Sequence, residues 1–563
     1  MRRISAVLGV ALLGAVLAAG PATTAGNVKT TLDRTIVGDA QGSLRYGPGE
    51  TRMVRKLDWD RARGKGTPVA GFKQLSDVHT IDEESPGRVE FFDMCDPSLS
   101  SAYRVQEAMS TQVGEAMLQV LSALNEGPAT GRSLDFTIST GDNIDSNQLN
   151  ELRWFIDLLD GKNVTPDSGA PGYDGYTQAQ FSGALPDEIL EEAQQPFNAT
   201  GTKQPWYVVL GNHDGLIQGS ITRSPAFRAV VIRNQKVFQN LEEYDCPESL
   251  DSSTLAAEFT RLYTESATEV PADESRTFLD KSDLIKEFDD TSGAPRGHGL
   301  RAAPDDPLTS ASDKAGYYAF DISRKVVGIS MDTISYSGGP EGQLDDAQFR
   351  WIEDQLRRNS KTYYDAEGVR RRNTDGRNKL IVLFSHHTSQ TLANTSMPDE
   401  VPEGMAPLHC YSAADGEGCA DGEGLGSLLT RYPNVVAWVN GHEHNNRISP
   451  IHAPTGTDPA RGLWEVNTAA HIDWPQQSRL IEIAYKPGRN GKPGSVFIYT
   501  TVVDHAAKPD PDNETDPVMR LAAISRVEAY FDACIRENQA TCAANGTPGD
   551  RNVKLVQKAP FRF

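Results

Sequence analysis

The sequence predicts an α/β fold in which buried strands end in polar motifs. Five apolar runs have the length and β-branched content of buried strands: GFKQLS, LDFTIST, WYVVL, KLIVLF and VVAWVN. Each is followed by a polar motif; these are Asp77-Val78-His79, Gly141-Asp142, Gly211-Asn212-His213-Asp214, Ser385-His386-His387 and Gly441-His442-Glu443-His444. Because ligands bind beyond the carboxyl ends of strands in open α/β sheets, we expect the motifs to gather at one edge of one sheet.

The regions between these runs predict the remaining elements. Apolar residues at helical spacing predict amphipathic helices, and Gly, Pro and Asp clusters predict loops. In chain order we expect a helix over 98–125, a helix over 149–160, an extended loop over 163–204, strands at 316–320 and 326–330, a helix over 345–357, late strands at 480–483 and 496–503, and a helix over 518–534.

The N-terminus has the pattern of a secretory signal peptide. Arg2 and Arg3 precede an apolar stretch over 4–19 that is too short for a membrane span, and small residues follow it. The paired arginines leave both the Sec route and the twin-arginine route open. We therefore expect an exported, soluble protein, extracellular or in the cell envelope.

The chain divides by composition into a leader, one large domain and an extension. We assign 1–25 to the signal peptide, 26–66 to an N-terminal leader, 67–505 to the main domain and 506–563 to a C-terminal helical extension. Inserts are expected at about 163–204, 216–315 and 388–426. Because long loops near a site are usually functional, the second insert is expected to shape access to the site.

Six cysteines in an exported chain favour disulfides over thiol chemistry. Paired metal-ligand cysteines would be expected as Cys-x-x-Cys, which the sequence lacks. Proximity pairs Cys410 with Cys419 and Cys534 with Cys542, which leaves Cys95 with Cys246. Other connectivities stay open, because spacing alone does not fix the pairing.

The formal net charge of −22 argues against a broad nucleic-acid or anionic-membrane surface. It does not argue against a phosphate substrate, because two divalent ions would leave the site locally cationic. No later apolar stretch reaches membrane length, and no partner protein can be read from the sequence.

The motifs supply oxygen and nitrogen ligands for two metal ions. Asp77 and His79 are two residues apart at a strand end and project to the same side, as do His442 and His444. Carboxylate, amide and imidazole ligands together suit Mn, Fe or Zn. A carboxylate such as that of Asp142 can bridge two ions about 3.5 to 4 Å apart. Taken alone, each motif also has a plain reading as a turn after a strand.

This order of motifs resembles the calcineurin-like metallophosphoesterase superfamily, whose pattern is D-x-H, G-D-x-x-D, G-N-H-D/E, H and G-H-x-H. The resemblance covers roughly residues 69–505, and the long inserts resemble a secreted actinobacterial branch. It implies a four-layer βαβ sandwich of two mixed sheets flanked by helices, with a dinuclear metal site at the carboxyl edge of the strands. It implies two ligand sets: Asp77, His79, Asp142 and His444 for one metal, and Asp142, Asn212, His386 and His442 for the other.

The resemblance also implies the chemistry. His213 corresponds to the histidine that contacts the substrate phosphate and can protonate the leaving oxygen. The implied activity is hydrolysis of phosphomonoesters or phosphodiesters by metal-activated hydroxide. Asp145 stands where purple acid phosphatases have an iron-binding tyrosine, so we expect no purple colour. Further substrate-side candidates are Asp214, His387 and His471.

One departure from the family pattern and two alternative classes of function stay open. Thr388 and Ser389 stand where many members have prolines, so the local turn can differ and His387 is a second ligand choice beside His386. Two other classes of function also remain: a metal-dependent hydrolase of a non-phosphate ester or amide, and a non-catalytic binding protein on the same fold.

Overall fold

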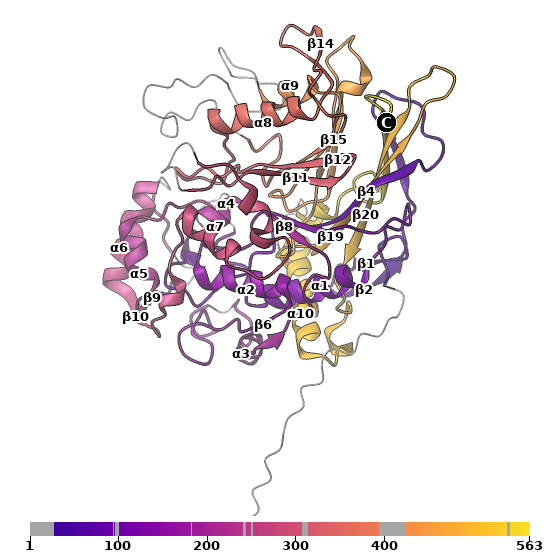
Figure 1. Ribbon diagram of the computed structural model, residues 1–563. Helices are drawn as coiled ribbons and strands as arrows, with labels where there is room; N and C mark the ends of the chain where they lie inside the picture. Colours follow the sequence, from indigo (N-terminus) through magenta and orange to yellow (C-terminus); the bar gives the residue numbers. More distant parts are fainter. Residues whose placement is uncertain are drawn as a thin grey trace, which may run out of the picture.

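The computed structural model has a mixed α/β fold, as predicted, with two large sheets (Figure 1). The structure describes residues 28–93, 95, 101–181, 183–239, 244–248, 252–306, 313–392, 424–536 and 541–563. The predicted signal peptide, most of the insert at 388–426 and the predicted pair Cys410–Cys419 lie outside these residues.

The seven-stranded sheet has the order β3-β21-β20-β19-β4-β5-β8. Strands β4, β5 and β8, the last three in this order, run parallel to one another, while β19 pairs antiparallel with β4 and β20. The bounds are β3 Met53–Lys56, β4 Thr67–Leu75, β5 Thr137–Thr140, β8 Trp206–Val209, β19 Gln477–Lys486, β20 Ser495–Asp504 and β21 Val553–Lys558.

The six-stranded sheet has the order β11-β12-β15-β16-β18-β17. Strands β12, β15, β16 and β18 are parallel, and the two edge strands are antiparallel to their neighbours. The bounds are β11 Tyr318–Ser323, β12 Val326–Ser330, β15 Leu380–Phe384, β16 Val435–Asn440, β17 Arg447–Ile451 and β18 Leu463–Asn467.

The two sheets share one apolar core, and helices cover their outer faces (Figure 1). Phe72 and Ile481 of the first sheet pack in the same buried cluster as Val382 and Val439 of the second. Helices α1 (Ser110–Ala123) and α2 (Leu149–Asp160) cover the seven-stranded sheet, and α10 (Pro517–Phe531) packs on α1. Helices α8 (Asp346–Arg358) and α9 (Leu425–Thr430) cover the six-stranded sheet.

The insert at 216–315 forms a group of elements on the left of Figure 1, and its helix α7 (Lys281–Asp289) packs in the same apolar cluster as α2 and β8. The disulfide Cys95–Cys246 ties it to the segment after β4, and Cys534–Cys542 closes a short loop after α10. Its elements are α5 Pro225–Val231, β9 Gln235–Val237, α6 Ser252–Ser266, β10 Ala267–Glu269 and α7 Lys281–Asp289.

Small elements complete the fold. They are β1 Arg34–Gly38, β2 Leu44–Pro48, β6 Asn163–Val164, α3 Asp187–Ala193, β7 Phe197–Asn198, α4 Asn212–Gly215, β13 Thr362–Tyr364 and β14 Arg370–Arg372. In the part of the chain that the structure describes, no helix is long and apolar enough to cross a membrane.

Three segments differ from the expectation. The helix expected over 98–125 begins only at Ser110, because the preceding turns place Arg104 and Glu107 in buried ion pairs. The expected loop over 163–204 contains α3 and the small β6–β7 sheet. The leader and the C-terminal extension both add strands, since β3 pairs with β21 at the edge of the seven-stranded sheet.

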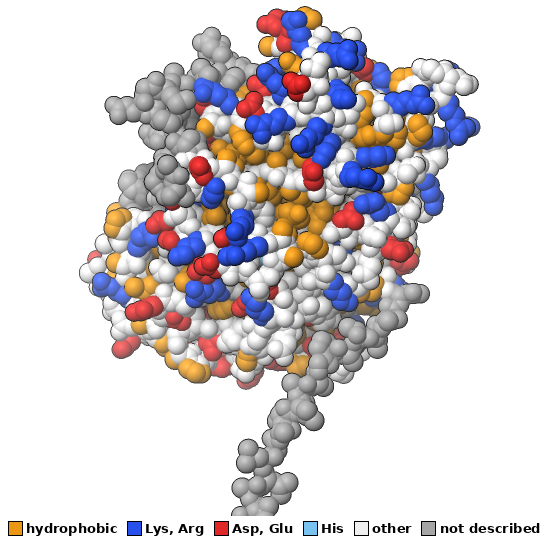
Figure 2. Space-filling model, in the orientation of Figure 1, with side chains coloured by type: hydrophobic (Ala, Val, Ile, Leu, Met, Phe, Trp, Pro, Cys, Tyr) orange, Lys and Arg blue, Asp and Glu red, His pale blue; other side chains and the backbone are white. Residues whose placement is uncertain are grey.

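Charge is unevenly spread over the surface. Figure 2 shows Lys and Arg side chains gathered on the upper half of one face, although the chain has a net charge of −22. The exposed strand β14 consists of three arginines and lies at the top of the same view. The net charge alone therefore does not describe this face, and the expectation about nucleic acids and membranes stays a prediction.

Candidate functional site

The polar motifs meet where strands of both sheets end. Three follow β4, β5 and β8 of the seven-stranded sheet, and two follow β15 and β16 of the six-stranded sheet. The expectation of a single sheet is therefore wrong. The two sheets face each other across a shared core, which the sequence pattern alone does not show. A hydrogen bond of 3.0 Å from the His442 backbone N–H to Asp77 Oδ1 joins the two sides.

The backbone at this junction is strained. Five residues of the motifs have a positive φ between 45° and 71°: Asp77, His79, Asp142, His442 and His444. This left-handed region is uncommon for residues other than glycine, and such strain gathers at functional sites. Glycine precedes two of these turns for a steric reason, because a Cβ at Gly141 or Gly441 would collide with His386 or Asp77. The motif glycines are therefore required by the close approach of the loops.

One group of side chains converges around Asp77. One ligand atom from each of Asp77, His79, Asp142 and His444 lies within 4.8 Å of the others. His444 Nε2 lies 3.3 Å from Asp77 Oδ1, and His79 Nε2 lies 3.7 Å from Asp142 Oδ2. All but His444 are buried. This set of two carboxylates and two imidazoles can hold one metal ion.

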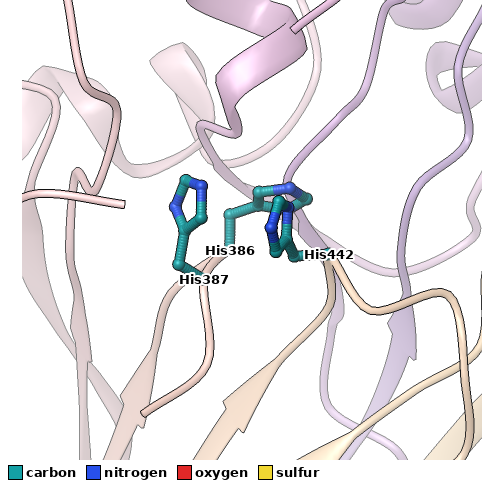
Figure 3. Close-up of side chains that lie close together, drawn as sticks. All are labelled: His386, His387 and His442. Atoms are coloured by element: carbon teal, nitrogen blue, oxygen red, sulfur yellow. The ribbon is translucent and has the colours of Figure 1, made fainter. Parts of the chain in front are cut away.

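A second group adjoins the first through Asp142. His386 Nε2 lies 2.9 Å from Asp142 Oδ2 and 3.9 Å from Asp77 Oδ1. The ring of His442 lies 5.1 Å from that of His386, and Figure 3 shows the two rings side by side. Asp142 therefore contacts histidines of both groups, which is the position of a bridging carboxylate.

The far side of each candidate ligand is anchored by the protein. His79 Nδ1 lies 3.0 Å from Asp145 Oδ1, and His386 Nδ1 lies 2.9 Å from the carbonyl of Thr140. The Asn212 amide N–H donates to the carbonyl of Gly219 at 3.0 Å. Metal-ligating side chains are usually held in this way by a hydrogen bond on the atom that faces away from the metal.

The atoms of these side chains that face the candidate metal positions have no hydrogen-bond partners. His79 Nε2, His386 Nε2 and Asn212 Oδ1 are buried and have no hydrogen-bond partner. Buried polar atoms are almost always paired, so three such atoms at one site call for a ligand. The donor set of imidazole, amide and carboxylate fits Mn, Fe or Zn. The residues present therefore fit a metal centre.

His387 is held by the protein through both ring nitrogens. Nδ1 lies 2.8 Å from Thr333 Oγ1, and Nε2 lies 2.9 Å from the carbonyl of Pro340. Burial, followed by the charge of His386, lowers the pKa of His387 to about 3, so this ring is neutral. Its ring lies 4.4 Å from that of His442 and 5.0 Å from that of His386 (Figure 3), and one ring nitrogen from each of the three histidines lies within 4.8 Å of the others. His386 stays the preferred ligand, because its Nε2 has no partner while both ring nitrogens of His387 do.

His213 sits at the floor of the site with one nitrogen directed by Asp145. Its Nδ1 lies 2.7 Å from the Asp145 carbonyl, and its Nε2 lies 4.0 Å from Asp142 Oδ2. Burial alone would lower the pKa of His213, but the carboxylates of Asp142 and Asp145 outweigh burial and raise it. A proton held on Nε2 is therefore available beside the candidate metal ligands.

Two further substrate-side candidates lie behind the site. The Asp214 carboxylate accepts hydrogen bonds from the backbone of Gly211 at 2.7 Å and of Asn143 at 3.1 Å, so it joins two motif loops. His471 is buried, and its backbone N–H donates to the Asp77 carbonyl at 3.0 Å. Asp214, His387 and His471 are absent from the described lining of the cleft. The structure shows hydrogen bonds of Asp214, His387 and His471 to neighbouring protein groups, and a contact of these residues with substrate stays a prediction.

Two supporting carboxylates were missed by sequence reasoning. Asp473 Oδ2 lies 2.6 Å from His444 Nδ1 and also pairs with Arg104 at 3.0 Å. Burial would raise the pKa of Asp473, but Arg104 and His444 outweigh it and lower the pKa. Asp145, three residues after Asp142, contacts His79 and His213 and pairs with Arg88 at 2.6 Å. Its spacing in the second motif was a signal for this role, while no local pattern marks Asp473.

The site opens into one large cleft with a volume of about 910 Å³. Its floor contains Asp142, Asn212, His213, His442 and His444. Of the insert at 216–315, the described lining includes Ser220 alone. The expectation that this insert shapes access stays a prediction, while residues within 529–533 and 542–550 of the C-terminal segment line one wall of the cleft.

Comparison with known proteins gives little to carry over. No protein-family model matches the sequence, and no curated protein matches it. A solved structure described as "Structure of PhoD" is similar at 11% sequence identity with a TM-score of 0.30, covering 87% of this chain and 80% of that chain. At this TM-score, neither the fold nor the activity of that protein is transferred to the chain.

Proposed function

We propose that this protein is an exported, metal-dependent phosphoesterase that uses two metal ions. The observation that carries the proposal is the convergence of the motif side chains, with three buried ligand atoms that have no partner. The resemblance of the motif order to calcineurin-like metallophosphoesterases supports the same reading. The disulfides Cys95–Cys246 and Cys534–Cys542 support export, because disulfides persist in oxidising compartments.

The proposed ligands follow the two groups of side chains. Asp77, His79 and His444 would hold one ion, Asn212, His386 and His442 the other, and Asp142 would bridge both. Mn, Fe and Zn all suit this set of donors. When bound, two such ions would neutralise phosphate oxygens and lower the pKa of water at the site.

The chain's own residues supply the rest of the chemistry. The carbonyl and carboxylate of Asp145 hold the Nδ1 side of the His213 ring. The Nε2 of His213 can then donate a proton to the departing alkoxide. Asp145, which is not a proposed metal ligand, helps to keep that proton on His213, because its carboxylate contributes to raising the pKa of His213. Water attacks phosphorus, the phosphorus–oxygen bond to the alcohol breaks, and the alcohol leaves with the proton from His213.

The test compares two variants of the purified mature protein loaded with Mn(II), Fe or Zn. We expect His213→Gln to keep both ions and to lose about 10²- to 10⁴-fold in turnover, the usual worth of a general acid. Asp142→Asn should lose metal, measured by elemental analysis. Initial rates on p-nitrophenyl phosphate and bis-p-nitrophenyl phosphate decide between phosphatase and phosphodiesterase. Wild-type activity in either variant would overturn the assignment.

A further inference from the structure

The outer wall of the cleft is built by the end of the chain. The lining residues from this segment are Ala529, Asp532, Ala533, Cys542, Ala543, Ala544, Asn545, Gly546, Thr547 and Asp550. The disulfide Cys534–Cys542 closes this loop on itself. The segment therefore faces the same open space as His213 and the candidate metal ligands.

This wall is fixed against the last motif. The backbone N–H of Asn446, two residues after His444, donates to the Ala544 carbonyl at 2.8 Å. Arg551 donates to the Asn545 carbonyl at 2.8 Å. Gly546 has a φ of 75° and approaches Asn446 so closely that a Cβ would collide with it. The wall is thus a rigid part of the site.

The described lining of the cleft offers little free positive charge for binding a second phosphate. Among the described lining residues outside the candidate ligands, the cations are Arg104 and Arg447. Arg104 pairs with Asp473 at 3.0 Å, and Arg447 Nη1 lies 3.7 Å from Glu443 Oε2. Phosphate recognition away from a metal relies on cationic side chains with donors to offer. The outer cleft therefore disfavours a polyanionic substrate.

The cleft is instead lined by neutral polar side chains. Asn445 lies on the loop of the last motif, and Asn545 and Thr547 lie on the C-terminal wall. An amide or a hydroxyl group can both donate and accept hydrogen bonds, as the hydroxyl groups of an alcohol do. Trp474 is the aromatic side chain of the described lining, but it is 5% exposed and packs on Tyr530. The described lining thus offers neutral hydrogen-bonding groups and little aromatic surface for stacking a base.

We propose that the C-terminal loop selects the alcohol part of the substrate and favours a hydroxyl-rich alcohol, such as a sugar or polyol. The proposal rests on the phosphoesterase function. The reaction is the same hydrolysis: water oxygen forms the new bond to phosphorus, and the alcohol leaves with the His213 proton. The alcohol's hydroxyl groups would form hydrogen bonds with the side chains of Asn445, Asn545 and Thr547 in the bound state.

The experiment measures kcat/KM for glucose 6-phosphate, n-hexyl phosphate and fructose 1,6-bisphosphate on the metal-loaded, full-length mature protein. We expect glucose 6-phosphate to be the best of the three by about 10-fold, in the range of specific hydrogen bonding. Asn545→Ala should lower the kcat/KM for glucose 6-phosphate by about 5- to 10-fold, the worth of one hydrogen bond, and lower the value for n-hexyl phosphate by less. Asn545→Asp keeps an acceptor and should keep the preference for glucose 6-phosphate over n-hexyl phosphate.

The control is Asn378→Ala, at the opposite end of β15 from His386, which should change no ratio. Calorimetric binding of glucose 6-phosphate and n-hexyl phosphate to metal-loaded His213→Gln gives a second readout, with the tighter binding expected for the sugar phosphate. Turnover of p-nitrophenyl phosphate without a preference for glucose 6-phosphate, or equal loss on all substrates in Asn545→Ala, would overturn this proposal alone. No turnover of any probe with metals bound would overturn the phosphoesterase function, and the selection with it.

Discussion

The insert at 216–315 and the C-terminal segment differ in how they contact the site. From the insert, Lys236 pairs with Glu90 at 2.6 Å, and Arg88 then links Glu90 to Asp145 at 3.1 and 2.6 Å. Asp145 in turn contacts His79 and His213. The C-terminal segment instead lines the open cleft. A long insert can therefore support a site from behind, while a short terminal loop faces the substrate.

The largest predicted effect comes from removing the positive charge of Arg88, which lies between Glu90 and Asp145 in the buried series of ion pairs. Arg88→Met leaves the carboxylates of Asp145 and Glu107 without their buried partner. Losing one partner of a buried pair costs about 3 to 5 kcal/mol of stability, and loss of an outer-shell contact costs about 10- to 100-fold in metal affinity. Arg88→Lys keeps one positive charge and should recover part of both losses.

The measurements are urea unfolding and Mn(II) titration. The ratio of kcat/KM between glucose 6-phosphate and n-hexyl phosphate should stay unchanged in Arg88→Met, since Arg88 is not among the described residues that line the cleft. A variant that alters this ratio while keeping wild-type metal affinity would show that the back of the site also selects substrate.

The two disulfides allow the same two regions to be compared in their effects on stability and on substrate preference. Cys95–Cys246 spans 151 residues of sequence and Cys534–Cys542 spans 8. In the chain-entropy model a longer loop gives more stability, about 5 kcal/mol against about 2 to 3 kcal/mol for these two. Cys95→Ala with Cys246→Ala should therefore lower stability more, by thermal and urea unfolding. Cys534→Ala with Cys542→Ala should cost less stability but reduce the substrate ratio. The reverse pattern would contradict the division of roles.

Metal binding is also predicted to depend on pH. Burial lowers the pKa of His386 and His444, but Asp142 and Asp77 respectively outweigh it and raise these pKa values to about 9 and about 10. The metal-free protein thus holds protons at pH 7 that a metal must displace, because only neutral imidazole binds metal. Mn(II) affinity should rise as pH increases from 7 toward 9, with proton release seen by calorimetry in buffers of different ionisation enthalpy. A flat profile would place the metal elsewhere.

Sequence reasoning was strongest at the strand ends. Residue type and strand direction together predicted that residues such as Asp142 and His386 would meet, because carboxyl ends of parallel strands converge. The strand pattern alone did not show the number of sheets, since a buried strand has the same pattern in either sheet; the family resemblance implied two. The substrate contact expected of Asp214 stays a prediction, and the sequence does not show that its carboxylate joins two motif loops.

The missed residues share one physical cause. Asp473 supports His444, and Arg104 supports Asp473, through contacts between residues far apart in the chain. The C-terminal wall reaches the cleft because β21 joins the edge of a sheet, which fixes the preceding loop beside Asn446. Neither arrangement leaves a periodic or local pattern in the sequence.

The most direct test of the central claim is anomalous diffraction from crystals of the mature protein grown with Mn(II). The proposed centre predicts two Mn peaks about 3.5 to 4 Å apart, the usual spacing in two-metal sites. Asp142 should lie between them, with His79 and His444 on one ion and His386 and His442 on the other. A fully loaded crystal with a single peak, or with peaks away from Asp142, would contradict the two-metal site.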